Sequence, residues 1–276
     1  MKMHIMHRDQ DFDLQHALPN NAQTLQQDLE LDTLLHAMAN DDEFLLDVAW
    51  KAVLTGLDND VDTILYRQAI LQDCLNNPDI VRALYALSVE AIEIREKSWL
   101  GIFSNYPGAT LRNAIAALEL FTSMLRKLRD IAEKQMGRFS SEGFKTLFSM
   151  IKEELNEAYL ASIDNHLTEL KFRRGVLISA ELGEGNKSDQ YVLREATGKS
   201  HLWLNRILGT GAPAYTFRIP DRDEAGAMAL SELKNRGINL VANALAQSSE
   251  HVLGFFRMMR TELAFYVGCL NLHDRL

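Results

Sequence analysis

Hydrophobic positions recur every three or four residues along most of the chain, which is the spacing of amphipathic helices. The first such stretch predicts one helix over Thr24–Ala39. Three more helices are predicted to follow, one opening at Asp41-Asp42-Glu43 and ending at Gly56, one starting at Asp60 or Asp62, and one from Pro78 to about Phe103. Acidic side chains interact favourably with the positive N-terminal end of a helix dipole, so their positions support these helix starts. Together the segments indicate a compact helical block.

Longer helices are predicted after Pro107. They cover Thr110–Gln135, Ser140–Lys171 and Asp223–His273. At a rise of 1.5 Å per residue the last one would reach about 75 Å if it is continuous. Uninterrupted helical patterns of that length are typical of coiled-coil arms, spacers or levers.

Between the two last helices the pattern changes to that of strands. The runs Gly175–Leu182 and Gln190–Arg194 are rich in apolar and β-branched residues, and the polar segment Gly183–Asp189 joins them as a hairpin connection would. A third strand is predicted over Ala214–Ile219, between Pro213 and Pro220. The expected fold class is mainly α, with a helical core, long helices and a small β-rich insert.

Charge is distributed unevenly over this framework. The net charge is −9, and residues 1–60 hold 12 acidic residues against 3 Lys or Arg, so the remainder is balanced. The segment Lys171–Arg222 carries nine Lys or Arg against five acids. We therefore predict weak, sequence-independent contact with DNA phosphates through Arg173, Arg174, Lys187, Lys199, Arg206 and Arg218. The alternative is an ordinary solvated hairpin surface.

Composition limits the cellular compartments in which the protein is expected to reside. The two cysteines, Cys74 and Cys269, cannot form a disulfide framework, and no apolar run approaches the roughly 20 residues that span a bilayer. These features favour a cytoplasmic protein that does not bind membranes. His4 and His7 form the only close histidine pair, in an N-terminal start that we expect to be mobile.

Catalytic motifs are incomplete. Gly198-Lys199-Ser200 resembles the end of a phosphate loop, but Leu193 stands where that loop requires its first glycine. Asp41-Asp42-Glu43 with Asp47 could serve a magnesium-diphosphate site, but Leu45 breaks the required spacing, which favours a helix-capping role. The histidines lack zinc-site spacing. We expect this chain to have no catalytic residue, no metal site and no cofactor of its own.

Four segments carry a resemblance to a known family. They are Leu29-Glu-Leu-Asp-Thr-Leu-Leu35, Asp62-Thr-Ile-Leu-Tyr-Arg67-Gln68-Ala-Ile70, Gly237-Ile-Asn-Leu-Val-Ala-Asn-Ala-Leu245 and Glu262-Leu-Ala-Phe-Tyr-Val-Gly-Cys-Leu270. These segments and the order of the predicted elements resemble MutS-type DNA mismatch repair proteins, in particular a bacterial MutS-related subgroup without the mismatch-reading domain. The resemblance implies an N-terminal extension (1–23), a helical core (24–139), an ascending lever helix (140–171), a clamp-like insert (172–222) and a descending lever helix (223–276).

The resemblance also implies a function. In this family a lever couples the nucleotide state of an ATPase to a clamp that touches the DNA backbone. The ATPase, with its ATP and magnesium, would follow after about Leu276, so we expect the chain to be part of a longer, homodimeric protein. No Phe-x-Glu mismatch-reading element precedes the core. The alternative is a free-standing helical scaffold that binds a protein partner.

Overall fold

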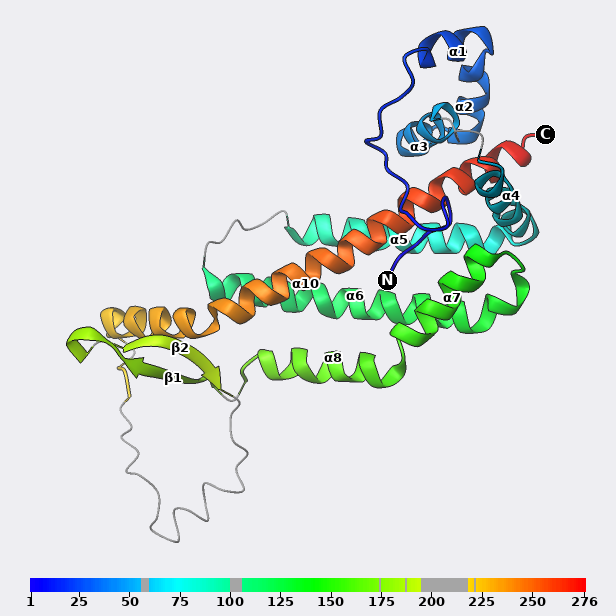
Figure 1. Ribbon diagram of the computed structural model, residues 1–276. Coiled ribbons are helices and arrows are strands. Elements are labelled where there is room, and N and C mark those ends of the chain that lie inside the picture. The colour runs from blue at the N-terminus through cyan, green and yellow to red at the C-terminus, as the bar shows by residue number, and fades with distance from the viewer. Residues whose placement is uncertain (56–59, 100–105, 174, 187, 195–217, 221) are drawn as a thin grey trace. The chain divides into compact units, whose positions relative to one another are not determined.

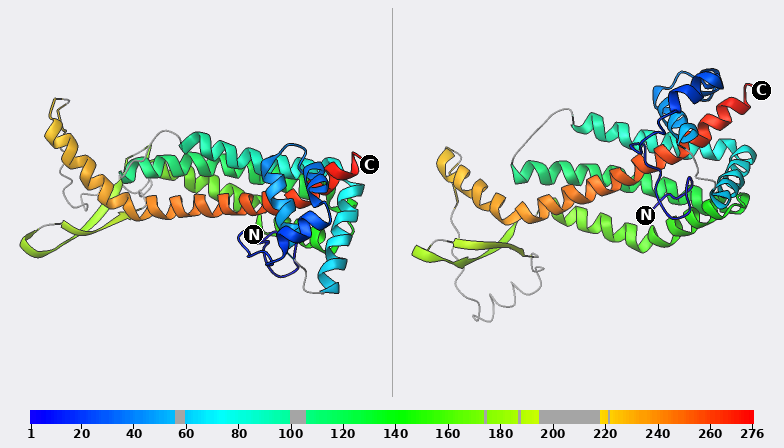
Figure 2. Two further views of the ribbon diagram at one scale, coloured as in Figure 1. Left: turned by 90° about the horizontal axis from the view of Figure 1, so that it is seen from above. Right: turned by 45° about the horizontal axis from the view of Figure 1, so that its top comes forward.

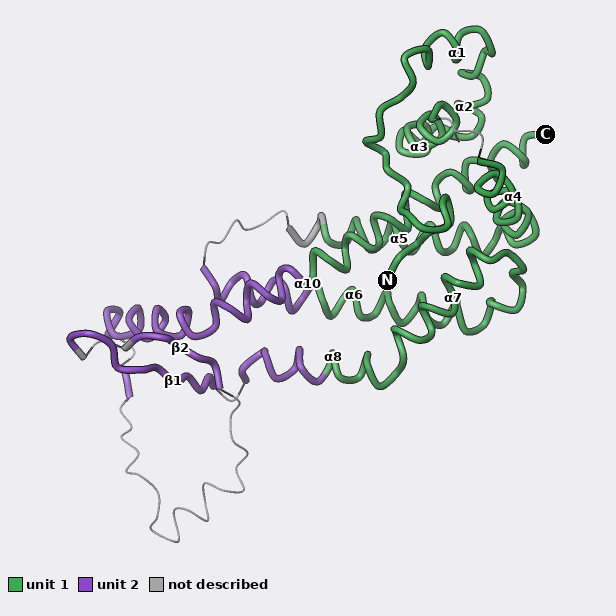
Figure 3. Tube along the Cα trace, viewed as in Figure 1, with its two compact units in different colours: residues 1–101, 117–164, 249–276 green, residues 102–116, 165–248 purple. Residues whose placement is uncertain are grey.

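The computed structural model describes residues 1–55, 60–99, 106–173, 175–186, 188–194, 218–220 and 222–276 (Figure 1). The chain divides into two compact units (Figure 3). Unit 1 comprises residues 1–101, 117–164 and 249–276, and unit 2 comprises residues 102–116 and 165–248. The regular secondary structure of the described residues is helical, apart from one two-stranded antiparallel sheet in unit 2. The expected mainly α fold class with a small β insert is confirmed.

Helices make up the described part of unit 1. They are α1 (Ala22–Asp28), α2 (Leu31–Ala39), α3 (Glu43–Leu54), α4 (Val61–Asn76), α5 (Pro78–Trp99), α7 (Glu142–Glu154), most of α6 (Pro107–Gln135), the start of α8 (Glu157–Leu170), the C-terminal half of α10 (Glu224–His273) and the short 3-10 helix η1 (Met136–Arg138). Within this unit α5 and α6 run beside α10 (Figure 2). The rings of Phe121 in α6 and Phe256 in α10 lie 6.0 Å apart between centroids.

A second aromatic cluster joins α7 to the turn before it. Phe139, Phe144 and Phe148 are buried, and the Phe139 ring lies 4.5 Å from that of Phe144 and 5.1 Å from that of Phe148. The helix α7 also approaches α4 closely at Gly143, where a Cβ would lie 2.6 Å from Ile70 Cδ1. The core of unit 1 is therefore closely packed by large side chains from helices that are distant in sequence.

Helix starts follow the predicted capping residues. The Asp42 carboxylate accepts from the backbone N–H groups of Phe44 at 2.8 Å and Leu45 at 3.1 Å. Asp60 accepts from Asp62 at 3.1 Å and Thr63 at 3.3 Å. These bonds satisfy N–H groups that the first turn of a helix leaves without partners. The predicted start at Pro78 and the continuous helix over 224–273 are confirmed, whereas the expected helix ends at Gly56 and Phe103 lie outside the described residues.

The predicted single helix over 24–39 is wrong. Two helices, α1 and α2, replace it, and Glu30 between them has a left-handed backbone with φ 50°. The side chain of Gln26 donates to Asp32 across the break and accepts from Trp50 Nε1 at 2.9 Å. The contact with α3 therefore stabilises a turn that the apolar spacing alone does not reveal.

The predicted continuity of the helix over 140–171 is also wrong. The chain forms α7 and α8, and Asn156 lies between them. Its Oδ1 accepts from the backbone N–H of Tyr159 at 3.0 Å, and its Nδ2 donates to the carbonyl of Glu153 at 3.1 Å. Asparagine competes with backbone hydrogen bonding inside helices and favours caps, so it ends one helix and begins the next.

The expected mobile start is wrong as well. Met3, Ile5, Met6 and Phe12 are all buried, with exposures of 5% or less. Residues 1–13 form no helix or strand, yet they are packed against the helices of unit 1. Burial of these apolar side chains orders a segment whose polar composition suggested the opposite.

Candidate functional site

The β-hairpin of unit 2 matches the predicted one closely. Strand β1 (Leu177–Leu182) pairs antiparallel with β2 (Ser188–Arg194), and the 3-10 turn η2 (Glu184–Asn186) connects them. The third predicted strand falls mostly on 214–217, outside the described residues, and Arg218 and Ile219 are not in a strand.

The N-terminal half of α10 holds the hairpin. A Cβ at Gly237 would lie 2.5 Å from Ile178 Cδ1, so β1 sits directly on the helix backbone at this glycine. At the adjacent residue, the Arg236 guanidinium lies 5.9 Å from the centroid of the Tyr191 ring and pairs with Glu232. Close approach and a cation–π contact thus fix the hairpin relative to α10 within unit 2.

The predicted phosphate-contacting residues are only partly described. Arg173 and Arg218 are exposed. Arg174, Lys187, Lys199 and Arg206 lie outside the described residues. The described acids of the insert, Glu181, Glu184 and Asp189, lie on the hairpin itself, so the described excess of positive charge flanks the hairpin.

Sequence reasoning missed a polar site in unit 1 that is built around Glu262 of α10. This side chain is fully buried and accepts from the backbone N–H groups of Ile5 at 2.6 Å, Met6 at 3.1 Å and Phe12 at 3.2 Å. Burial raises the pKa of Glu262 to about 7, although the three N–H donors favour its ionised form. The signal in the sequence was a single carboxylate within the apolar run 262–270.

Three further side chains hold the same segment through its carbonyl groups. The Tyr266 hydroxyl donates to the carbonyl of Ile5 at 2.6 Å, and the Tyr66 hydroxyl donates to that of His4 at 2.6 Å. Arg67 Nε donates to the carbonyl of Met6 at 2.7 Å. Burial raises the pKa of Tyr66 to about 12, so this hydroxyl remains a donor at neutral pH.

The neighbouring histidine completes the arrangement. His7 Nε2 lies 2.8 Å from a terminal nitrogen of Arg67, which donates to it when the imidazole is neutral. Burial and the positive charge of Arg67 lower the pKa of His7, which favours that neutral form. The site can therefore bind the backbone of a bent segment, through donors to its carbonyls and a carboxylate that accepts from its N–H groups.

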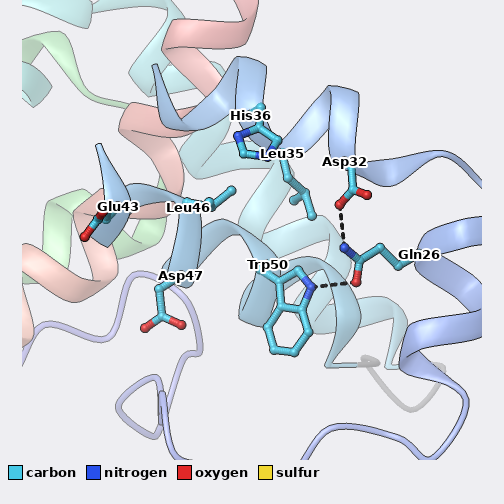
Figure 4. Close-up of a pocket in the computed structure, with 8 residues that line it drawn as sticks. All are labelled: Gln26, Asp32, Leu35, His36, Glu43, Leu46, Asp47 and Trp50. Atoms are coloured by element: carbon cyan, nitrogen blue, oxygen red, sulfur yellow. Dashed lines mark hydrogen bonds between the residues drawn. The ribbon is translucent and has the colours of Figure 1, made fainter. Parts of the chain in front are cut away.

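A third feature is a groove of about 390 Å³ on α1–α3 (Figure 4). It is lined by Gln26, Asp32, Leu35, His36, Glu43, Leu46, Asp47 and Trp50. Of the acids considered for a magnesium-diphosphate site, Glu43 and Asp47 line this groove, while Asp42 caps α3. Within the described ranges, no group of three or more His, Cys, Asp or Glu side chains is arranged to hold a metal ion.

The chain is thus a mainly helical protein in which a β-hairpin is inserted between two helices. A family model described as "MutS2 N-terminal domain" matches residues 59–276, and the chain belongs to this family. Comparisons with curated proteins and with solved structures gave no significant match. The expected relation to MutS proteins is confirmed at this level. The matched range contains Tyr66, Arg67, Glu262 and Tyr266, whereas residues 1–58, with α1–α3, lie outside it.

Among the described residues, none of the helices combines the length and the apolar character that crossing a bilayer requires.

Proposed function

We propose that the chain is the core, lever and clamp region of a MutS-related DNA-binding ATPase. In this proposal the hairpin and its basic flanks contact the DNA backbone, and α10 transmits the nucleotide state of an ATPase elsewhere in the full-length protein. The observation that carries the proposal is the seating of the hairpin on α10, through Gly237 and Ile178, in a chain of the MutS2 N-terminal domain family.

The mechanical part of the proposal rests on the continuity of α10. This helix runs for 50 residues without a break, from the residues that carry the hairpin to residues packed in the core of unit 1. An α-helix resists bending because each backbone N–H is bonded to a carbonyl four residues earlier. A displacement at one end is thereby passed on to the other. The chain itself has no catalytic role in this proposal, and ATP and magnesium belong to the proposed ATPase of a homodimer.

The DNA contact is proposed to be electrostatic. Arg173 precedes β1 and Arg218 precedes α10 in the chain; both are exposed, and guanidinium groups bind phosphate oxygens without reading bases. Binding should therefore be independent of sequence, weaken steeply with salt, and have a Kd of about 10⁻⁴ to 10⁻⁶ M at physiological salt.

The test compares three forms of the chain on duplex DNA at low salt by fluorescence anisotropy. Arg173→Glu/Arg174→Glu reverses two charges beside the hairpin, and Lys145→Glu/Lys152→Glu makes the same charge change at exposed positions of α7. We expect the first variant to lose at least tenfold in affinity and to reduce the salt slope by about 2, because two phosphate contacts are lost. The α7 variant should bind like the wild type. Equal binding by all three forms would rule out the clamp.

A scaffold function is the second candidate, and the groove on α1–α3 favours it. That groove combines the apolar side chains of Leu46 and Trp50 with exposed carboxylates. Two results together would support this alternative: no DNA binding in the test above, and a protein partner that binds at α1–α3.

A further inference from the structure

Residues 1–13, which we call the N-terminal strap, are attached to unit 1 in an unusual way. In the described part of the chain, no backbone–backbone hydrogen bond involves residues 1–12. Their backbone is held instead by side chains of α4 and α10, and the Lys2 N–H donates to Met150 Sδ of α7 at 3.2 Å. Two ion pairs, between the N-terminus and Glu154 and between Arg8 and Glu142, also join the strap to α7. We call the four residues of α4 and α10, Tyr66, Arg67, Glu262 and Tyr266, the cradle. The strap is therefore not part of a sheet or a helix, and its mode of attachment is that of a bound peptide.

The cradle forms hydrogen bonds with both the N–H groups and the carbonyl groups of the strap backbone. Glu262 accepts from N–H groups of the strap, while Tyr66, Arg67 and Tyr266 donate to its carbonyls. All four are side chains of the two segments, 62–70 and 262–270, that carry the family resemblance. Residues 5–10 of the strap are bent, His4 has a left-handed backbone with φ 46°, and the N–H groups of Ile5, Met6 and Phe12 converge on Glu262. Because backbone groups are common to every sequence, this recognition requires a segment that can bend in this way and does not depend on particular polar side chains.

Apolar side chains of the strap provide the second part of the interaction. Met3, Ile5 and Met6 are 2%, 0% and 0% exposed, and Phe12 is buried beside them. Removal of these apolar side chains from water is the main contribution to the affinity. The ligand class that the cradle fits is thus a peptide that bends around Glu262 and has apolar side chains at these positions.

The helices that form the cradle are packed independently of the strap. Ile70 of α4 contacts α7 at Gly143, and Phe256 of α10 contacts Phe121 of α6. The strap itself is joined to α1 by residues 14–21, of which Gln15, Ala17 and Pro19 are exposed. The strap can leave without any of these helix contacts being broken.

We propose that the cradle is a peptide-binding site and that the strap is its resident ligand, which is released and rebound as a unit. The family model covers the cradle but not the strap, which is consistent with a receptor surface and a separate ligand segment. After release, Glu262 and the donors of the cradle would bind water or another apolar peptide that can bend in the same way. This inference is independent of DNA binding by the hairpin.

The test uses the full chain with a protease site inserted between Pro19 and Asn20, cut only after folding. A fluorescent peptide of residues 1–16 is then added, and its binding is followed by anisotropy. We expect the labelled peptide to exchange with the cut strap, while uncut protein and a peptide of scrambled sequence show no binding. Glu262→Ala should weaken peptide binding at least tenfold, because it leaves the N–H groups of Ile5, Met6 and Phe12 without their acceptor.

Circular dichroism and hydrogen exchange distinguish a ligand from an integral part of the core. The helical signal of the cut protein should persist when the strap is washed out. In the uncut chain, which needs no insertion, the amides of Ile5, Met6 and Phe12 should exchange together and before the amides of the α10 core. Loss of helical signal with the strap, absence of exchange with the labelled peptide, or strap amides that exchange only with global unfolding would each overturn the proposal.

Discussion

The Glu262 carboxylate accepts a hydrogen bond of 2.6 Å from the backbone N–H of Ile5, although the two residues are 257 positions apart. This bond connects the beginning of the chain to α10 in the core of unit 1. Glu262 has no water-exposed surface, so the charge of its ionised form depends on the three N–H groups of the strap. A buried charge without partners is costly, which makes the titration of this residue a measurable property of the fold.

Stability should fall as the pH rises from about 4.5 to about 7. Burial raises the pKa of Glu262 from 4.5 to about 7, so in this range the folded chain holds a proton that the unfolded chain has released. The contribution is fully present below pH 4.5, is lost progressively up to about pH 7, and amounts to about 3 kcal/mol at most. Urea unfolding of the wild type and of Glu262→Gln between pH 4.5 and 8 measures it. The wild type should lose stability relative to the variant and level off above pH 7; parallel curves would contradict the assignment.

Gly143→Ala should destabilise unit 1. An added Cβ would lie 2.6 Å from Ile70 Cδ1 and 2.8 Å from the Tyr66 hydroxyl oxygen, and both side chains are buried and fixed by other contacts. Overpacking of this kind costs about 1–3 kcal/mol. Gly254→Ala is the matched control, because this exposed glycine of α10 has no atom within 4 Å of the added Cβ and should gain about 0.5–1 kcal/mol. Thermal unfolding should lower Tm in the first variant and raise it in the second. The opposite order would show that α4 and α7 do not meet at Gly143.

Asp73→Ala should cost more than the loss of an ordinary helix cap. The buried Asp73 carboxylate accepts from the N–H groups of Ser140 at 2.9 Å and Ser141 at 2.7 Å, and thereby fixes the turn between η1 and α7 to α4. Truncation leaves buried donors without a partner, which we expect to cost about 2–4 kcal/mol. Asp60→Ala removes the same charge from an exposed cap and should cost about 1 kcal/mol. Equal losses in denaturant unfolding would refute a structural role for the buried carboxylate.

A compensating pair tests the contact between the hairpin and α10. Gly237→Ala places a Cβ against Cδ1, Cγ1 and Cγ2 of Ile178, at 2.5, 2.8 and 3.0 Å. We expect faster amide hydrogen exchange along β1, because the strand must move away from the helix. Ile178→Ala removes all three of those atoms, so the double variant should exchange more slowly than Gly237→Ala alone. If the second substitution adds to the effect of the first, β1 does not rest on α10 at Gly237.

Some elements could be predicted because their causes are local. Asp42 and Asp60 cap the helices that begin beside them, and Pro78 occupies a first helical position where its missing N–H is not needed. The hairpin was predictable from alternating apolar residues on either side of a polar, glycine-containing segment. In each case the interacting groups are within a few residues of one another, so the pattern along the chain contains the relevant contact.

The periodicity of apolar residues was not enough to predict the breaks in two of the helices. Asn156 offered a local signal, since its side chain bonds to Glu153 and Tyr159, but apolar spacing continues through it. The break at Glu30 depends on Gln26, whose amide reaches both Asp32 and Trp50. Trp50 belongs to a different helix, so this interaction exists only after α3 has folded against α1 and α2.

Local patterns along the chain were enough to predict the helical class, most helix starts, the long C-terminal helix and the hairpin. The burial of residues 1–13 and their binding by Glu262 depend on how distant segments pack together. The physical reason is that a buried carboxylate takes whichever donors the path of the chain brings to it. Here the N–H groups of Ile5 and Phe12 reach Glu262 from more than 200 positions away, and no spacing pattern along the sequence records such a contact.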